Sequence, residues 1–371
     1  MADEPLQMPL HETHLAAEAT MGSAGGWSVP MHYGCLFAEA ERANGAAGLF
    51  DLSHLGRLRI RGNGALDLLE RVCTHDVAHQ EDDTAELTCL CNERGGIINC
   101  GFLYRLPRFW VLTTNPDCRE KVLAYLTEVA TQFDGVRVDD QTRTVAQFGA
   151  VGPHAEALLG AVLPINIEGL PRGTAKMGSL MVANYIASRT GLTRQWSLEV
   201  MVPNAFASQA WTYVTKKAGD NAIRPCGHAA RDILRMQAVL PRYGHEINET
   251  IDPVTASLER CVDFGHDFIG GDAVRKMAER GPQRRRVLLK LDSHDEDDLS
   301  IPRLGTPLYD DEGREIGTVT SGTLTPTGRA VMVQAYVVTD MAETQVHAVL
   351  DEPSSRTGLI LHVCGDRERS S

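Results

Sequence analysis

The sequence lacks a long apolar run. No stretch approaches the roughly 20 consecutive apolar residues that a membrane-spanning helix needs, and the segment Met1–Pro5 has neither the basic start nor the apolar core of a secretory leader. We therefore expect no membrane association and a cytoplasmic location. Basic residues are few, 36 against 49 acidic ones for a formal net charge of -13. Binding of nucleic acid through an extended basic surface is therefore not expected.

General catalytic motifs are missing as well. The chain has no phosphate-binding glycine loop, no G-x-G-x-x-G, no H-E-x-x-H and no G-x-S-x-G. Its nine cysteines are scattered, and the spacing of Cys89, Cys91 and His75 matches no common zinc motif, so we expect reduced thiols and no metal site. The basic run Arg284–Arg286 and the acidic run Asp292–Asp298 read as solvated charge clusters at a domain edge.

The pattern of apolar residues indicates a mixed α+β fold. Residues 56–61 alternate apolar and basic side chains, as a half-buried strand does, and a helical pattern follows directly. Gly95 and Gly96 are expected in a tight turn between strands, where positive φ is needed. A chain of this length exceeds a single core, and a similar order of strands and helices recurs in its second part. We therefore predict two α+β lobes, residues 1–140 and 141–282.

The pattern changes after Pro282. Short strands are predicted at 287–291, 315–319, 330–338 and 358–363, separated by Gly, Pro and Asp turns. This alternation is typical of a small all-β module. We place it at residues 283–371.

A set of longer segments, taken in order, carries a family resemblance. They are Gly25–Trp27, Pro30–Gly34, Ala47–Leu55, Thr74–Val77, Asn92–Ile98, Ser188–Gly191, Ala230–Arg235, Tyr243–Pro253, Asp267–Gly270 and Thr320–Thr323. With them the chain resembles the folate-binding aminomethyltransferase family, the T-protein of the glycine cleavage system and its relatives. The resemblance covers residues 8–340, and its strength lies in the number of segments in register.

The resemblance implies an architecture and an activity. The expected protein has three lobes, two of them α+β and the C-terminal one like a β-barrel, around a central channel that holds tetrahydrofolate. The implied enzyme is an aminomethyltransferase that takes the aminomethyl carbon from the lipoyl arm of the H-protein, releases ammonia and leaves methylene-tetrahydrofolate. The expected partner is thus a lipoylated H-protein, with no nucleic acid.

Three residues at matched positions are the expected folate contacts. The carboxylate of Glu199 can accept paired hydrogen bonds from the pterin, and Arg231 can supply a cationic donor fork. Asn115 offers a neutral amide nearby.

Each of these residues also has an ordinary interpretation. Glu199 fits the outward position of an alternating strand, and Asn115 is a common turn residue. Arg231 can serve as an ion-pair partner of Asp232 or Glu246.

The family pattern breaks where its catalytic carboxylate is expected. The resemblance implies two aspartates after Gly-Gly-Ile-Ile, the first of them catalytic, and here the residues are Asn99 and Cys100. An amide cannot ionise, and loss of one acid–base group removes about two to four decades of rate. We therefore expect Asn99 to limit catalysis and an aspartate restored there to speed the reaction. Cys100, Glu93 and Asp51 are alternative proton acceptors that the sequence does not rank.

A second break lies just before Glu199, where the family segment T-G-Y-T-G-E-x-G is replaced by residues 190–197 with a different loop sequence. Three functions stay open at this point. The first is the glycine cleavage aminomethyltransferase itself. The others are a paralogue that moves a methyl group from an O- or S-methyl donor to tetrahydrofolate, and a non-catalytic folate-binding protein.

Overall fold

The computed structural model describes residues 4–161, 163, 166–180, 183–191, 193, 195–217, 223–292, 301–310, 312–328, 330–341 and 357–363. The chain divides into two compact units. The first consists of Met1–Arg71, Asp76–Thr88 and Asn99–Leu234, and the second of Val72–His75, Cys89–Ile98 and Arg235–Ser371. Both contain strands and helices or turns in mixed order, so the predicted α+β class is confirmed. The division at residues 140 and 282 stays a prediction.

A six-stranded sheet forms the centre of the first unit. Its order is β11 (Ala175–Leu180), β12 (Ala183–Ser188), β13 (Ser197–Pro203), β10 (Val145–Val151), β4 (Gly48–Asp51) and β14 (Arg224–Pro225). Neighbours run antiparallel except β14, which is parallel to β4. Gly149 of β10 lies opposite Glu199 of β13, and Phe148 lies opposite Asp51 of β4.

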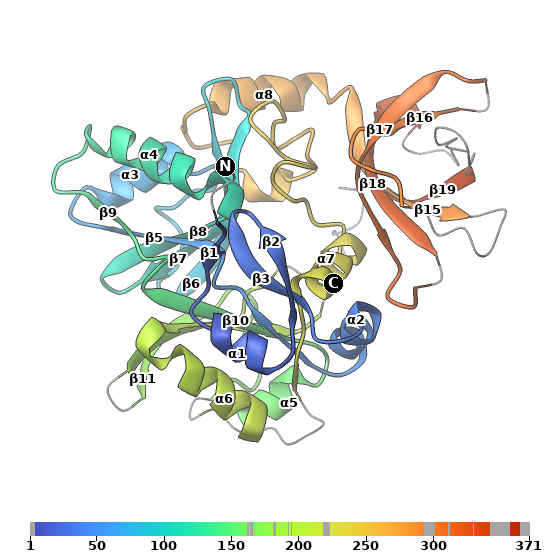
Figure 1. Ribbon diagram of the computed structural model, residues 1–371. Coiled ribbons are helices and arrows are strands. Elements are labelled where there is room, and N and C mark those ends of the chain that lie inside the picture. The colour runs from blue at the N-terminus through green and yellow to red at the C-terminus, as the bar shows by residue number, and fades with distance from the viewer. Residues whose placement is uncertain are drawn as a thin grey trace. The chain divides into compact units, whose positions relative to one another are not determined.

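Helices cover both faces of this sheet because its strands are apolar on both. On one face Phe148 packs edge-on against Trp211 of α6 (Ala207–Lys217), with ring centroids 5.5 Å apart. The helices α1 (His11–Ala16) and α5 (Ala155–Gly160) lie on the same core, and Figure 1 shows α1 and α6 beside β10. On the other face Phe50 meets Ile233 of α7 (His228–Gln237) and the alanines of α2 (Leu36–Gly45). Burial of each large side chain stabilises the unit by about 1.5–3 kcal/mol.

A five-stranded sheet packs against the first through a shared core. Its order is β6 (Thr84–Cys91), β7 (Ile97–Leu106), β8 (Phe109–Thr114), β5 (Gly56–Arg61) and β9 (Arg137–Asp140), and α3 (Ala65–Val72) and α4 (Arg119–Ala130) accompany it in the chain. Tyr104 and Leu106 of β7 and Val111 of β8 are buried together with Ala175 and Met201 of the six-stranded sheet. This contact brings β7 within reach of β13.

The N-terminal segment forms a small three-stranded sheet that the sequence pattern did not predict. Its order is β1 (Leu6–Gln7), β3 (Trp27–His32) and β2 (Thr20–Ala24). Its buried residues include Ala24, Trp27 and Val29. The strands are too short for a clear period-2 signal.

The turn between β6 and β7 uses both of the predicted glycines. Gly95 has φ 82°, and the Asn92 amide donates to the Gly96 carbonyl at 2.9 Å. A Cβ on Gly96 would lie 1.8 Å from the Glu249 carbonyl oxygen. Positive φ at one position and a close backbone approach at the next explain why both must be glycine.

The second unit holds an antiparallel sheet and α8 (Gly271–Arg280). The sheet order is β16 (Pro307–Tyr309), β17 (Glu315–Leu324), β18 (Val331–Val338), β15 (Arg284–Asp292) and β19 (Thr357–Val363). Inward residues such as Val287, Val319 and Val333 form its core. The four predicted strands overlap four of these five. The described residues also form 3-10 turns, η1 (Pro116–Cys118) and η2 (Asn204–Phe206) in the first unit and η3 (Glu259–Cys261) and η4 (Thr339–Met341) in the second.

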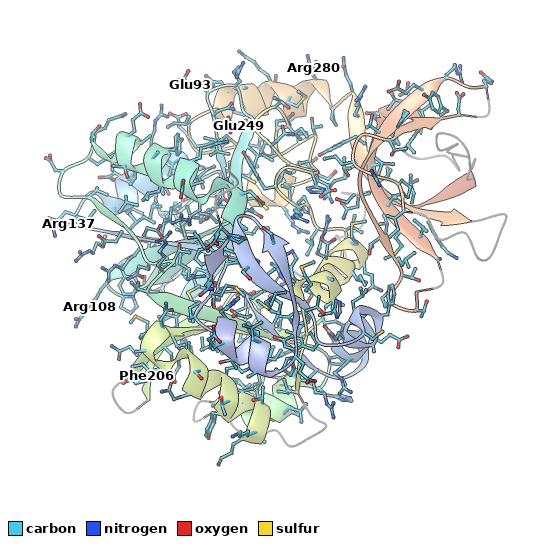
Figure 2. All side chains as sticks on the ribbon, in the orientation of Figure 1. Glu93, Arg108, Arg137, Phe206, Glu249 and Arg280 are labelled. Atoms are coloured by element: carbon cyan, nitrogen blue, oxygen red, sulfur yellow. The ribbon has the colours of Figure 1, made fainter. Side chains whose placement is uncertain are left out.

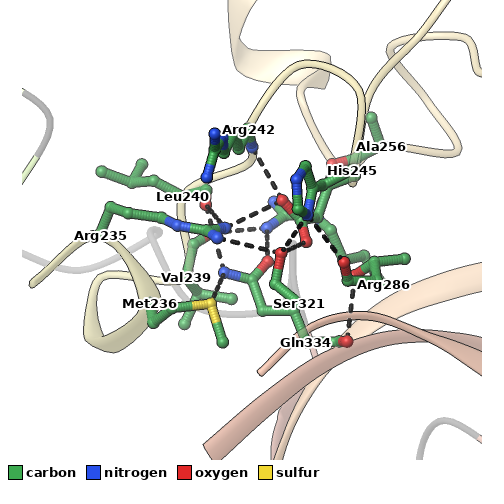
Figure 3. Close-up of polar contacts among 12 residues, drawn as sticks. Arg235, Met236, Val239, Leu240, Arg242, His245, Ala256, Arg286, Ser321 and Gln334 are labelled. Carbon is green, nitrogen blue, oxygen red and sulfur yellow. Dashed lines mark hydrogen bonds and ion pairs between the residues drawn. The ribbon is translucent and has the colours of Figure 1, made fainter. Parts of the chain in front are cut away.

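A buried polar cluster in this unit corrects the interpretation of the basic run. Arg286 is only 2% exposed, and it donates to Gln334 Oε1 at 2.7 Å and to the Val239 and Ala256 carbonyls at 2.6 and 3.2 Å. Figure 3 shows these contacts. Alternation along β15 puts Arg286 on the face opposite Val287, where Leu288 packs with Met236 and Val239. On that face carbonyl and amide oxygens take the place of water around Arg286. Most of the acidic run lies outside the described residues.

Candidate functional site

Glu199 is a buried carboxylate in the middle of β13. Its side chain is 8% exposed, and Oε2 accepts a hydrogen bond from Gln147 Nε2 at 2.8 Å. Gly149 lies opposite it, and a Cβ on Gly149 would lie 2.9 Å from Leu52 Cδ1 and 3.7 Å from Glu199 Cγ. Burial raises the pKa of Glu199, and the positive charge of Arg231 and the hydrogen bond from Gln147 oppose that rise. The outward strand position suggested as an alternative is therefore wrong.

Hydroxyl groups complete the surroundings of this carboxylate. Tyr104, Ser188 and Thr190 are each at most 2% exposed. The Tyr104 hydroxyl lies 3.3 Å from Thr190 Oγ1, and Ser188 Oγ lies 2.8 Å from the same atom. Burial, followed by the charge of Glu199, raises the pKa of Tyr104, so the phenol stays protonated and remains a donor.

Arg57 orients the amide that holds Glu199. Its side chain is fully buried and donates to the carbonyls of Ser53, Leu55 and Thr142 at 2.9, 2.7 and 2.8 Å. A further contact of 3.5 Å reaches Gln147 Oε1. The Gln147 oxygen thus faces a cation, and its nitrogen is left to donate to the carboxylate. Burial lowers the pKa of Arg57 to about 10, which keeps it charged at neutral pH.

Arg231 supplies positive charge from the helix that covers this face. It lies in the first part of α7, is half-buried, and contributes to the electrostatic environment of Glu199. Glu246, suggested as an alternative partner, is instead paired with Arg235 at 2.9 Å. The charge of Arg231 thus acts on the Glu199 carboxylate.

Asn99 has a structural task. Its side chain is fully buried, Nδ2 donates to the Thr113 carbonyl at 3.1 Å, and Oδ1 accepts from the Asn115 amide at 3.2 Å. The Cys118 thiol donates to the same Oδ1 at 3.3 Å, and burial raises the pKa of this thiol to about 12, which keeps it protonated. The amide therefore joins the end of β7 to the end of β8. Its burial does not support the catalytic assignment, which stays a prediction.

Asn115 lies beside Asn99 and begins the turn η1. It is half-buried, and its Nδ2 donates to the Cys100 carbonyl at 3.2 Å. This bond fixes the side chain and leaves the amide oxygen as the acceptor that it offers. The structure thus brings Asn99, Cys100 and Asn115 together.

Two of the alternative proton acceptors, Glu93 and Asp51, have surroundings of their own. Glu93, labelled in Figure 2, is exposed in the turn after β6. Asp51 is buried, and its Oδ2 lies 2.9 Å from His14 Nε2. Because Asp51 is opposite Phe148 and Glu199 is opposite the next residue, the two carboxylates point to opposite faces of the sheet.

His14 bridges that carboxylate and a phenol. Its Nδ1 lies 2.7 Å from the Tyr33 hydroxyl, and its ring packs edge-on against Trp211 at 5.4 Å between centroids. Burial, followed by the negative charges of Asp51 and Glu39, raises the pKa of Tyr33. These contacts tie α1 to β4 and to the end of β3.

Several site residues were missed from the sequence, namely Arg57, Tyr104, Gln147, Ser188 and Thr190. Arg57 and Tyr104 lie on strands of the five-stranded sheet, Gln147 and Ser188 lie on strands of the six-stranded sheet, and Thr190 follows β12. No local pattern marks their convergence. In the divergent loop before Glu199, Leu192 and Arg194 lie outside the described residues. Gly191 has φ 137°, and a Cβ there would lie 2.2 Å from Ser197 Oγ.

Among the described residues, neither a metal-binding cluster nor a membrane-spanning helix is found. No group of three or more His, Cys, Asp or Glu side chains among them is arranged to hold a metal ion. No helix in the described part of the chain is long and apolar enough to cross a membrane.

Fold and site together define a class of protein: an α+β protein with a buried carboxylate that accepts a hydrogen bond from an amide and is influenced by the charge of an arginine. Residues 10–266 match the family model of the GCVT N-terminal domain, and residues 284–354 match that of the glycine cleavage T-protein C-terminal barrel domain. The chain belongs to the glycine cleavage T-protein family, the aminomethyltransferases.

Individual relatives agree with this assignment. The aminomethyltransferase of Desulforamulus reducens is 32% identical over 337 residues, which cover 90% of both chains. That of Streptomyces avermitilis is 32% identical over 342 residues, covering 91% of this chain and 90% of the relative. The crystal structure of glycine cleavage system aminomethyltransferase T from Bartonella henselae superposes with a TM-score of 0.87 at 27% identity, with 97% of both chains covered.

Proposed function

We propose that this protein is the aminomethyltransferase of the glycine cleavage system, which transfers the aminomethyl carbon from lipoylated H-protein to tetrahydrofolate and releases ammonia. The transferase class and tetrahydrofolate as cosubstrate follow from family membership. We propose lipoylated H-protein as the donor because the family acts in the glycine cleavage system. No nucleic acid takes part in this reaction, and the cytoplasmic location stays a prediction.

The observation that carries the proposal is the buried Glu199 carboxylate with its aligned partners. A pterin presents adjacent N–H donors along one edge, and a carboxylate accepts two such bonds in one plane. Gln147 occupies one carboxylate oxygen from the side, and Arg57 prevents that amide from turning. Glu199 therefore does not reorganise when a ligand edge arrives, which favours binding.

The remaining predicted contacts have separate tasks. Arg231 offsets the charge of the ionised carboxylate and offers a donor fork to the ligand. Asn115 offers an amide oxygen at the end of β8, where its nitrogen is already bonded. Both roles are proposals that rest on position and chemistry.

Calorimetric titration with tetrahydrofolate tests the site. Glu199→Ala should weaken binding by about 1–3 kcal/mol, roughly 5- to 150-fold, because the donor edge of the pterin loses its acceptor. The matched control is Glu168→Ala, which removes an exposed carboxylate from the same unit and should leave the affinity unchanged. Equal affinity of the wild type and Glu199→Ala would remove Glu199 from the site.

A further inference from the structure

The turn between β12 and β13 is closed by the side chain of Ser197. The Ser197 hydroxyl donates to the Thr190 carbonyl, and Arg189 Nη1 donates to the Ser197 carbonyl at 3.2 Å. The Arg189 guanidinium also stacks over the Trp196 ring, 4.6 Å from its centroid. The family segment that residues 190–197 replace ends in glycine, which has no hydroxyl to donate. This chain therefore holds the turn with side chains of its own.

Gly191 shows how closely the turn approaches the carboxylate of Glu199. Its φ of 137° favours glycine, and a Cβ there would lie 2.2 Å from Ser197 Oγ and 3.8 Å from Glu199 Oε1. Gln147 donates to the other oxygen, Oε2, at 2.8 Å. The turn therefore borders the side of the carboxylate that carries Oε1.

The Thr190 hydroxyl belongs to the buried group of hydroxyls around Glu199. Ser188 Oγ lies 2.8 Å from Thr190 Oγ1, the Tyr104 hydroxyl lies 3.3 Å from it, and Ser188 is opposite Glu199 in the pairing of β12 with β13. Burial raises the pKa of Glu199, and the charge of Arg231, followed by hydrogen bonds that include one from Thr190, opposes that rise. The position of Thr190 thus matters to the carboxylate.

Ser197 determines where Thr190 lies. Thr190 is only 2% exposed, and a buried carbonyl without a donor is unfavourable, so loss of the Ser197 hydroxyl favours movement of the turn until its carbonyl is hydrogen-bonded again. Such a movement displaces the Thr190 hydroxyl from Glu199.

We propose that Ser197 is a positioning residue of the folate site, which acts through Thr190 to align the Glu199 carboxylate. The inference rests on the proposed function, in which folate is the ligand of that carboxylate. Ser197 fixes the Thr190 backbone, and the Thr190 hydroxyl together with the Gln147 amide restrains the carboxylate. A restrained carboxylate loses little freedom when the donor edge of a pterin binds, which favours affinity.

A double-mutant cycle in tetrahydrofolate affinity tests this coupling. Ser197→Ala and Thr190→Val, which keeps the shape of threonine without its hydroxyl, should each weaken binding about three- to tenfold, the usual contribution of one hydrogen bond. The double variant should be no weaker than the weaker of the two single variants, because both changes remove the same contact with Glu199. Fold-losses that multiply in the double variant overturn the proposal, and so does unchanged affinity in Ser197→Ala.

Three further variants separate positioning from damage to the fold. Thr190→Ser keeps the hydroxyl and should bind tetrahydrofolate as tightly as the wild type. Ser197→Gly takes the residue of the family segment and should reproduce the loss seen in Ser197→Ala. Ser179→Ala removes an exposed hydroxyl from β11 of the same sheet and should leave the affinity unchanged. If Thr190→Ser binds as weakly as Thr190→Val, the hydroxyl is not responsible and the proposal fails.

Glu199→Ala in the same titrations keeps two failures apart. A wild-type protein that does not bind tetrahydrofolate contradicts the proposed function, and equal affinity of the wild type and Glu199→Ala contradicts its site. If Glu199→Ala loses affinity while Ser197→Ala and Ser197→Gly do not, only the role of Ser197 is contradicted.

Discussion

Asn99 and Arg57 show how buried polar side chains hold this backbone together. Each donates mainly to carbonyl oxygens of neighbouring segments, Arg57 to three of them and Asn99 to that of Thr113. Buried carbonyls without a donor cost about 1–3 kcal/mol each, so these side chains are as much part of the strand ladder as the amides are. In the alternating sequence pattern, Arg57 occupies a position that is expected to face solvent. It is buried because the six-stranded sheet packs against the five-stranded sheet to which it belongs.

At the same scale, Glu199 should release a proton when folate binds. Burial raises its pKa, so part of the free protein carries the neutral acid at pH values above the ordinary value of about 4.3. Donors on the pterin edge favour the ionised form and lower that pKa again. Between the ordinary and the raised value, binding should therefore expel up to one proton, and at higher pH none.

Titrations in two buffers with different ionisation enthalpies measure this proton. Glu199→Gln keeps the size of the side chain but cannot ionise, so its apparent binding enthalpy should not depend on the buffer. The same proton release in wild type and variant would assign it to another group.

Asn99→Asp should destabilise the fold. The new oxygen would lie where Nδ2 now donates to the Thr113 carbonyl, so a buried donor is replaced by an acceptor. We expect a loss of about 2–4 kcal/mol in the free energy of unfolding at neutral pH, and a smaller loss near pH 4, where the buried acid is neutral. Urea denaturation at both pH values measures it. Asn63→Asp, at an exposed position, is the control, and a loss as small as that of the control would show that Asn99 is not a structural residue.

At the scale of elements, strands with strong local patterns were predictable and their partners were not. The alternating run at 56–61 forms β5, and the pair Gly95-Gly96 marks the turn between β6 and β7. The alternation of β15 was visible, but not that Arg286 on it is buried. Pairing of β10 with β13 joins segments about fifty residues apart, so the bond from Gln147 to Glu199 left no local signal. Glu199 could be predicted as a folate contact only from its position in the segments that resemble the family.

The polar cluster in Figure 3 should make the second unit sensitive to acid. Burial works to raise the pKa of Glu246, but Arg235 and hydrogen bonds from Ser321 and the Arg242 amide hold it below its ordinary value. A depressed carboxyl pKa contributes stability that is present above the unfolded value of about 4.3 and is lost as pH falls through the folded value.

Glu246→Gln tests this contribution. It leaves Arg235 buried without its carboxylate and should lower stability by about 3–5 kcal/mol at neutral pH, with less difference at pH 3. Thermal unfolding across this pH range, with the exposed Glu279→Gln as control, measures both effects. If the difference in stability between wild type and Glu246→Gln is the same at all pH values, the substitution acts through lost packing and not through lost charge.

For the whole molecule, the resemblance to the family predicts more of the fold and function than any local sequence pattern does. The two family models cover residues 10–266 and 284–354, and the relatives match along about nine-tenths of the chain. The chain departs from the family pattern at residues 99 and 100, an amide and a thiol, and in the loop of residues 190–197. The proposed folate contacts are kept, so binding is expected to be less affected than turnover.

Ammonia release from aminomethylated, lipoylated H-protein tests the central claim most directly. The assay compares the complete mixture with mixtures that lack tetrahydrofolate, lack H-protein, or contain Glu199→Ala in place of the wild type. We predict ammonia and methylene-tetrahydrofolate in equal amounts in the complete mixture, little without folate, and a lower rate at limiting folate with the variant. Absence of ammonia from a protein that binds tetrahydrofolate would contradict the account, and demethylation of a methoxy or methylthio substrate by the same protein would assign it to a different transfer.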